Sequence, residues 1–128
     1  MPWSLEHIEN LQIVELTISG RVSGDELKDA AAARIALGQE KGVDKYIINV
    51  THIDAPESTT ADVYDIPTKM YAEKNLSRAS QIAVIAPLSS ESMWVTGLYE
   101  DICVNRGWRV QTFLDRNLAI DWLQESRL

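Results

Sequence analysis

Short apolar segments and longer stretches with helical periodicity alternate along the 128-residue chain. Within residues 11–19, the apolar side chains of Val14, Leu16 and Ile18 alternate with the more polar set Ile13, Glu15 and Thr17. This alternation predicts a strand with one face better buried than the other. The segment from Leu5 to Ile8 precedes this strand across the turn-like pair Glu9-Asn10. We therefore predict that the two segments form an antiparallel hairpin.

The run from Gly20 to Leu27 ends this strand and starts a helix. Ser23 and Glu26 have the spacing of a capping box, in which each side chain accepts a hydrogen bond from the backbone N–H of the other residue. Gly42 is suited to end the helix because glycine readily adopts the left-handed conformation. The first helix is therefore predicted to span Gly24 to Lys41.

Two further segments, Lys45 to Val50 and Gln81 to Ala86, are short, largely apolar and rich in β-branched residues. This composition is typical of parallel strands that helices cover on both faces. A helix is predicted between them, roughly from Thr60 to Lys74. Pro67 lacks a backbone N–H and is expected to kink or divide that helix.

The next predicted helix is capped by Ser89 or Ser90 and ends near Arg106. A last strand, Arg109 to Phe113, and a last helix after Asp115 follow it. The order ββαβαβαβα predicts an α/β fold with a four- or five-stranded sheet, mixed but mostly parallel, and the hairpin at one edge. We expect a single domain over residues 1–128.

Composition narrows the classes of function. Acidic residues outnumber Lys and Arg by 19 to 12, the net charge is −7 and the basic residues are scattered, so no nucleic-acid partner is expected. No apolar run approaches the roughly 20 residues of a membrane span, and the start of the chain lacks the features of a signal peptide. The single cysteine, Cys103, cannot form an internal disulfide, so a reduced, cytoplasmic location is expected.

Several segments resemble a known family. They are Ser19-Gly20-Arg21-Val22-Ser23-Gly24-Asp25-Glu26-Leu27 after the hairpin, the strands Tyr46 to Val50 and Gln81 to Ala86, and Gly107-Trp108 to Phe113 followed by Ala119-Ile120-Asp121-Trp122-Leu123. With these segments the chain resembles the SpoIIAA-like proteins, which share the STAS fold with bacterial anti-sigma-factor antagonists and are sometimes compared with CRAL-TRIO lipid-binding domains. The resemblance covers nearly the whole chain, and it implies a STAS fold, a bacterial source and a regulatory role through protein contacts.

Better-known relatives carry an Asp-Ser-(Ser/Ala)-Gly turn after the strand that corresponds to Tyr46 to Val50, and a partner kinase phosphorylates the serine of that turn. This chain instead reads Thr51-His52-Ile53-Asp54-Ala55-Pro56-Glu57-Ser58-Thr59-Thr60. Ser58 is the nearest candidate in position, but the flanking Asp and Gly are missing. We therefore do not carry the phosphorylation over to this chain.

Residues that follow the central strands are candidates for a site, because ligands of open α/β sheets bind beyond the carboxyl ends of the parallel strands. Two loops, Thr51 to Thr60 and Pro87 to Glu91, are predicted to meet there. Their Ser and Thr residues are interpreted as helix caps, since no glycine-rich loop or lysine accompanies them as in an anion site. The candidate ligand or partner surface comprises Asp54, Ser58, Thr59, Tyr64, Tyr71, Ser89, Ser90 and Trp94.

The sequence assigns no catalytic residue, metal site or cofactor. It lacks a Gly-x-Ser-x-Gly turn, and neither histidine has a second ligand at metal spacing. Asp54 and Glu57 are interpreted as solvated loop carboxylates, and an enzyme that uses them as acid and base is a third alternative to the two hypotheses below. The leading hypothesis is a non-enzymatic regulatory domain that contacts a protein partner or a second copy of itself. The alternative is a domain that binds a small apolar molecule or lipid in a pocket near the kinked helix, lined by Tyr64, Tyr71, Trp94 and Tyr99.

Overall fold

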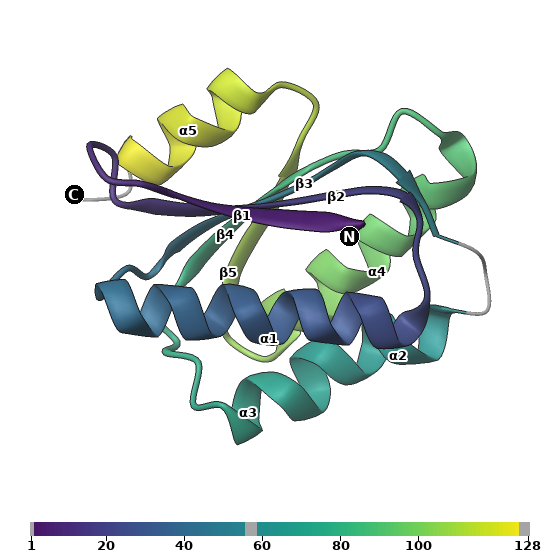
Figure 1. Cartoon of the computed structure of the whole chain (residues 1–128), viewed down its shortest axis with the longest axis horizontal. Coiled ribbons are helices and arrows are strands. Elements are labelled where there is room, and N and C mark those ends of the chain that lie inside the picture. Colours follow the sequence, from purple (N-terminus) through teal and green to yellow (C-terminus); the bar gives the residue numbers. More distant parts are fainter. Residues whose placement is uncertain (1, 56–58, 126–128) are drawn as a thin grey trace.

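The computed structural model describes residues 2–55 and 59–125, and of Ser90 and Glu91 it describes the backbone alone (Figure 1). Its strands are β1 (Trp3–Ile8), β2 (Ile13–Arg21), β3 (Lys45–Asp54), β4 (Gln81–Ile85) and β5 (Arg109–Phe113). They form one sheet in the order β1-β2-β3-β4-β5, in which β1 is antiparallel to β2 and every other pair of neighbours is parallel. The predicted α/β fold with a mixed, mostly parallel sheet and a hairpin at its edge is confirmed.

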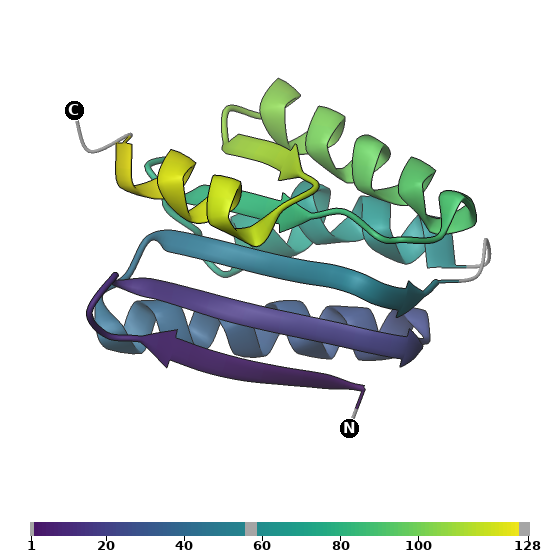
Figure 2. The same ribbon diagram turned by 90° about the horizontal axis from the view of Figure 1, so that it is seen from above.

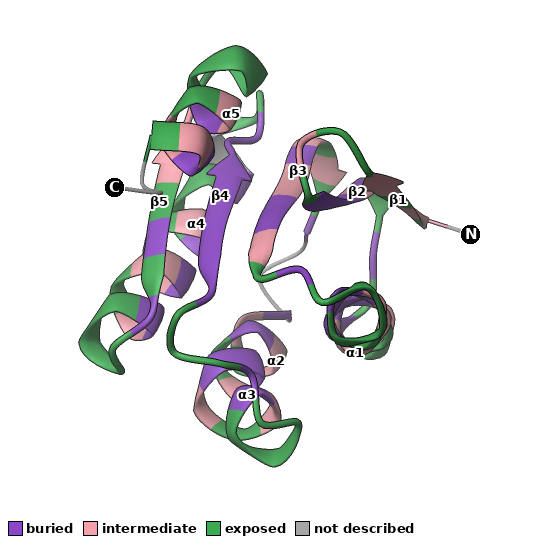
Figure 3. Ribbon diagram, turned by 90° about the vertical axis from the view of Figure 1, so that its left-hand side faces the viewer, coloured by how far each residue is buried: buried purple, intermediate pink, exposed green. Residues whose placement is uncertain are grey.

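The helices cover the two faces of the sheet unequally. They are α1 (Gly24–Lys41), α2 (Thr60–Asp65), the π-helical segment η2 (Ile66–Met70), α3 (Tyr71–Glu73), α4 (Ser90–Asn105) and α5 (Arg116–Glu125). A large apolar cluster joins one face of the sheet to α1, α2 and α4, whereas α5 packs on the other face over a smaller cluster (Figures 1 and 2). Strand β4 lies between these layers and is buried along its whole length (Figure 3).

Helix α1 begins and ends where the sequence predicts. The Ser23 hydroxyl accepts a hydrogen bond from the backbone N–H of Glu26 (3.1 Å), and the Glu26 carboxylate accepts one from the N–H of Ser23 (2.9 Å). At the other end, Gly42 adopts the left-handed conformation with a φ of 66°. The capping box and the glycine stop are therefore confirmed, and the buried stripe Leu27, Ala30, Ala31 and Ile35 determines which face of α1 packs against the sheet.

Pro67 changes the hydrogen-bond pattern of the helix after β3. The π-helical segment η2 separates α2 from α3, and the N–H of Tyr71 donates to the carbonyl of Ile66, five residues earlier. Proline has no N–H to donate to the carbonyl four residues before it, and a π-helical turn is a known way in which a helix accommodates such an interruption. The predicted division of this helix is confirmed, and it takes the form of a π bulge.

The predicted loop from Thr51 to Thr60 is wrong in its first part, because β3 continues to Asp54. The register shifts between the pairs Thr17–Asn49 and Ser19–His52, where β3 has one residue more than β2, and the pairs Ser19–His52 and Arg21–Asp54 extend the parallel ladder beyond this shift. Pairing with β2 satisfies the backbone groups of a segment that has little apolar pattern of its own. Asp54 therefore ends a strand rather than lying within a loop.

Candidate ligand pocket

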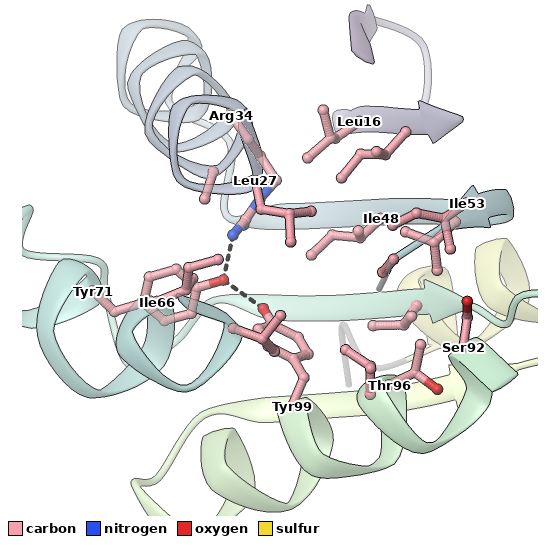
Figure 4. Close-up of a pocket in the computed structure, with 17 residues that line it drawn as sticks. Leu16, Leu27, Arg34, Ile48, Ile53, Ile66, Tyr71, Ser92, Thr96 and Tyr99 are labelled. Atoms are coloured by element: carbon pink, nitrogen blue, oxygen red, sulfur yellow. Dashed lines mark hydrogen bonds between the residues drawn. The ribbon is translucent and has the colours of Figure 1, made fainter. Parts of the chain in front are cut away.

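A cavity of about 80 Å³ lies between the sheet and helices α1, α2 and α4 (Figure 4). Most of the described residues that line it are apolar: Leu16, Ile18, Leu27, Ala31, Ile48, Val50, Ile53, Ala55, Val63, Ile66, Val84 and Val95. The lining residues with polar groups are Arg34, Tyr71, Ser92, Thr96 and Tyr99. The cavity is therefore an apolar space with a few polar groups on its helical side.

Helical periodicity positions the walls of the cavity. On α1, Leu27, Ala31 and Arg34 follow each other at i, i+4 and i+7, so they share one face of the helix. On α4, Ser92, Thr96 and Tyr99 have the same i, i+4 and i+7 spacing and therefore also share one face. Strands β2, β3 and β4 supply the opposite side with side chains that alternate toward this face of the sheet. The cavity thus combines segments that are far apart in the sequence.

Arg34 is the most unusual residue of this site, because its side chain is fully buried. Its Nη2 donates a hydrogen bond to the hydroxyl of Tyr71, and the guanidinium carbon lies 5.0 Å and 5.4 Å from the ring centroids of Tyr46 and Tyr71. Within the described part of the chain, Nε and Nη1 have no hydrogen-bond partner, and no carboxylate pairs with this guanidinium. Arginine keeps its charge in proteins, so a cation is buried here beside uncharged groups.

A chain of hydroxyl and thiol groups continues from the guanidinium. The hydroxyls of Tyr71 and Tyr99 are hydrogen-bonded to each other (Figure 4), and the Tyr99 hydroxyl lies beside the thiol of Cys103. Burial raises the pKa of Tyr71, raises that of Tyr99 well above its ordinary value, and raises the pKa of Cys103 to about 12. All three groups are therefore protonated and neutral near pH 7, and none of them compensates the charge of Arg34.

The structure brings only some of the predicted aromatic residues together. Tyr71 and Tyr99 line the cavity, and their rings meet edge to face with centroids 6.5 Å apart. Tyr64 and Trp94 are 48% and 44% exposed, and neither lines the cavity. Both lie on helices whose inner faces are occupied by other residues, such as Val63 on α2. They belong to the outer surface of the molecule.

The remaining predicted residues lie outside the cavity. Asp54 is exposed at the end of β3, with a carboxylate oxygen 3.8 Å from a guanidinium nitrogen of Arg21. Thr59 is buried at the N-cap position of α2 and Ser89 lies at that of α4, but in the described structure neither side chain forms a capping hydrogen bond. The side-chain caps predicted for these two residues are therefore wrong. Ser58 and Glu57 lie outside the described residues, as does the side chain of Ser90.

Sequence reasoning missed the wall that α1 contributes, including Arg34. A signal for it was present, because Arg34 follows Leu27 and Ala31 on the buried stripe of an amphipathic helix, where an arginine is unusual. The residues that surround its guanidinium, Tyr46 and Tyr71, come from separate elements, and their positions depend on the fold.

Neither a membrane-spanning helix nor a cluster of metal ligands is present among the described residues. No helix there is both long and apolar enough to cross a lipid bilayer. No three His, Cys, Asp or Glu side chains of residues 2–55 and 59–125 are grouped so that they could bind a metal ion together.

Comparison with known proteins identifies the fold. The solved structure of an uncharacterised protein of the DUF3478 family from Shewanella loihica PV-4, described as having a SpoIIAA-like fold, aligns with 94% of this chain and 91% of its own. The TM-score is 0.57 and the sequence identity is 16%. No protein-family model matches the sequence, and no curated protein matches it significantly. The chain therefore has a SpoIIAA-like fold, as its resemblance to that family implied.

Proposed function

We propose that this SpoIIAA-like fold is a non-enzymatic binding domain that holds a small apolar ligand in the cavity between the sheet and α1, α2 and α4. The observation that carries the proposal is the cavity itself. Protein interiors are close-packed and contain few voids larger than a water molecule. The cavity is partly open to solvent, so water can enter it, but its walls are almost entirely apolar and bind that water poorly. A small apolar ligand that displaces the water and covers these walls is the simplest explanation of such a space.

The chemistry of the lining supports binding rather than catalysis. Among the described lining residues there is no carboxylate, histidine or cysteine, which are common acids, bases and nucleophiles of enzymes. Burial raises the pKa values of the two lining tyrosines, Tyr71 and Tyr99, which makes their hydroxyls poor sources of protons near pH 7. An apolar space with few polar groups is typical of a ligand pocket.

The size of the cavity limits the ligand. A volume of about 80 Å³ holds roughly five to eight water-sized groups, at about 10–15 Å³ for each. This volume suits a small branched or aromatic molecule. A lipid with a long acyl chain exceeds it, so of the apolar ligands considered from the sequence we favour the small molecule.

The proposal is tested with toluene as a probe and a variant that fills the cavity. Ala31 lines the cavity and is buried, so Ala31→Leu adds three carbon atoms into the space. Ala36 lies on the same helix and is exposed, so Ala36→Leu makes the same chemical change outside the cavity. Toluene is added to ¹⁵N-labelled protein, and backbone amide shifts are followed by NMR.

We expect toluene to shift amides of α1, α4 and β3 in the wild type and in Ala36→Leu, and to bind at least about tenfold more weakly to Ala31→Leu because the space is occupied. Native mass spectrometry of the wild type adds a search for a co-purified small molecule. If toluene shifts no amides around the cavity, or if Ala31→Leu binds it as the wild type does, the proposed site is wrong.

A second candidate function is contact with another protein, the leading hypothesis from the sequence. Leu88 is 76% exposed, and Met93 and Trp94, close by in the chain at the start of α4, are 43% and 44% exposed. Grouped exposed apolar side chains often mark contact surfaces. Sedimentation velocity over a range of concentrations compares the wild type with Trp94→Ser. Self-association that weakens in the variant supports a dimer through this surface, and a wild type that stays monomeric at the highest concentration contradicts it.

A further inference from the structure

We infer that the ligand of the cavity is a small monocarboxylic acid, whose apolar part fills the space and whose carboxylate pairs with the guanidinium of Arg34. This inference rests on the proposed function, because it assigns the chemical class of ligand to the same cavity. It is carried by two observations together: a fully buried cation with unused hydrogen-bond donors, and an apolar space that this cation lines.

The positive charge of Arg34 is not balanced by any described side chain. A buried ion is strongly unfavourable unless an opposite charge and hydrogen bonds compensate for its lost hydration. The groups that face Arg34 from the neighbouring elements are Tyr46 of β3, Tyr71 of α3, and Tyr99 and Cys103 of α4. Each is uncharged near pH 7, so the described structure leaves the guanidinium without a counter-ion. A ligand anion would supply the missing charge.

Two nitrogen atoms of the Arg34 guanidinium have no hydrogen-bond acceptor among the described residues. A guanidinium has five N–H groups in a planar fork. Nη2 donates to the Tyr71 hydroxyl, whereas Nε and Nη1 are buried and have no acceptor among the described residues. Arginine binds carboxylates well because the fork matches the two carboxylate oxygens. Both nitrogens are covered from the cavity as well as from bulk solvent, so an acid reaches these unpaired donors when the side chains between Arg34 and the cavity move aside.

The single cation and the small volume of the cavity disfavour larger and more highly charged ligands. One guanidinium neutralises one negative charge, which matches a monocarboxylate better than a phosphate ester with its second charge. The apolar lining provides no other cationic group among the described residues. The volume of about 80 Å³ leaves room for an apolar part of only a few carbon atoms or a single small ring.

The test compares an acid with a neutral molecule of the same shape. We use 3-methylbutanoate and 3-methylbutanamide at pH 7, each titrated into ¹⁵N-labelled wild-type protein. The carboxylate is charged at pH 7 and the amide is neutral, and hydrogen bonds between charged groups are stronger than those that involve a neutral group. We therefore expect the acid to bind about 10- to 100-fold more tightly than the amide. The Arg34 Nε–H signal is expected to shift with the acid and to move little with the amide. Equal affinity for the two molecules overturns the inference.

Variants identify the residue responsible. Arg34→Met removes the charge but keeps a long side chain, and we expect it to bind acid and amide within about threefold of each other. Arg109 is exposed on β5, so Arg109→Met removes a cation away from the cavity and is expected to retain the preference for the acid. An Arg34→Met variant that is folded and retains the full preference overturns the inference. If this variant does not fold, the wild-type acid-to-amide ratio and the Arg34 Nε–H shift decide the question.

The outcomes separate the inference from the proposed function. If toluene and the amide bind in the cavity and the acid binds no better than the amide, the domain binds small apolar molecules and the assignment of an acid is wrong. If none of the probes shifts amides around the cavity, the proposed function and the inference fail together. An acid that binds equally well to Ala31→Leu binds elsewhere, and this result also overturns the inference.

Discussion

The substitution Gly38→Ala tests the packing that surrounds the buried arginine. Gly38 lies on α1 over Tyr46, the residue whose ring lies 5.0 Å from the guanidinium carbon of Arg34. A Cβ atom at position 38 would lie 2.1 Å from the Tyr46 hydroxyl oxygen and 2.7 Å from two of its ring carbons. Tyr46 is 1% exposed and its hydroxyl donates to the carbonyl of Val43 (3.2 Å), so the ring has little freedom to move away.

Two opposing terms set the size of the effect. Alanine is better than glycine inside a helix by about 1 kcal/mol, whereas overpacking a core costs about 1–3 kcal/mol and occasionally more. The contacts at Gly38 are so short that we take the upper end of this range, which gives a net loss of about 2 kcal/mol. Urea unfolding followed by far-UV circular dichroism measures it.

Gly97 provides a matched control because it lies inside α4 with nothing within 4 Å of an added Cβ. Gly97→Ala is therefore expected to stabilise the protein by up to about 1 kcal/mol. Tyr46→Phe removes the nearest atom, so Gly38→Ala should cost less in that background, by about 1 kcal/mol. If Gly38→Ala is as stable as the wild type, the packing of Tyr46 beneath α1, and with it the surroundings of Arg34, is not as described.

Two further predictions concern a cap and a buried thiol. Ser23→Ala removes one half of the capping box and should lower the free energy of unfolding by about 1 kcal/mol. Ser89 lies at an N-cap without a described capping hydrogen bond, so Ser89→Ala should change the free energy of unfolding little. Equal effects of the two substitutions in urea unfolding would contradict this prediction. The pKa of Cys103 is raised to about 12, so the folded protein keeps a proton that the unfolded chain loses above roughly pH 8.5. Stability should therefore fall as pH rises from about 8.5 to 12, by at most about 1.4 kcal/mol per pH unit from this group, and less steeply in Cys103→Ala. The native thiol should also resist DTNB at pH 8, and rapid labelling without unfolding would contradict its burial.

Local signals in the sequence were sufficient for much of the fold. The boundaries of α1 were predicted correctly because Ser23, Glu26 and Gly42 act on neighbouring backbone groups, whose geometry depends little on the rest of the molecule. Strand β5 was also placed correctly, at the short run Arg109–Phe113 that follows the left-handed Gly107 after α4. The hairpin at one edge and the parallel direction of the central strands followed from the alternation of strands and helices, whereas the neighbour order β1-β2-β3-β4-β5 was not specified.

Features that depend on distant partners were predicted less well. The last residues of β3 have little apolar pattern, and only their pairing with the end of β2 makes them a strand. The cavity was expected near the kinked helix, and Tyr71 and Tyr99 do line it, but its α1 wall was not foreseen. Arg34 and Tyr71 are 37 residues apart in the chain, and their hydrogen bond exists only because the π bulge and α1 are packed together. Sequence patterns do not specify such a contact.

The most direct test of the account is diffraction from a crystal of the protein held under xenon pressure. Xenon binds in dry apolar cavities of proteins, and its anomalous signal locates it without knowledge of the natural ligand. We predict a xenon site in the cavity between the sheet and helices α1, α2 and α4 in the wild type, and a much weaker site or none in Ala31→Leu. A wild-type crystal with no xenon in this space, or with the space closed by neighbouring side chains, would contradict the account.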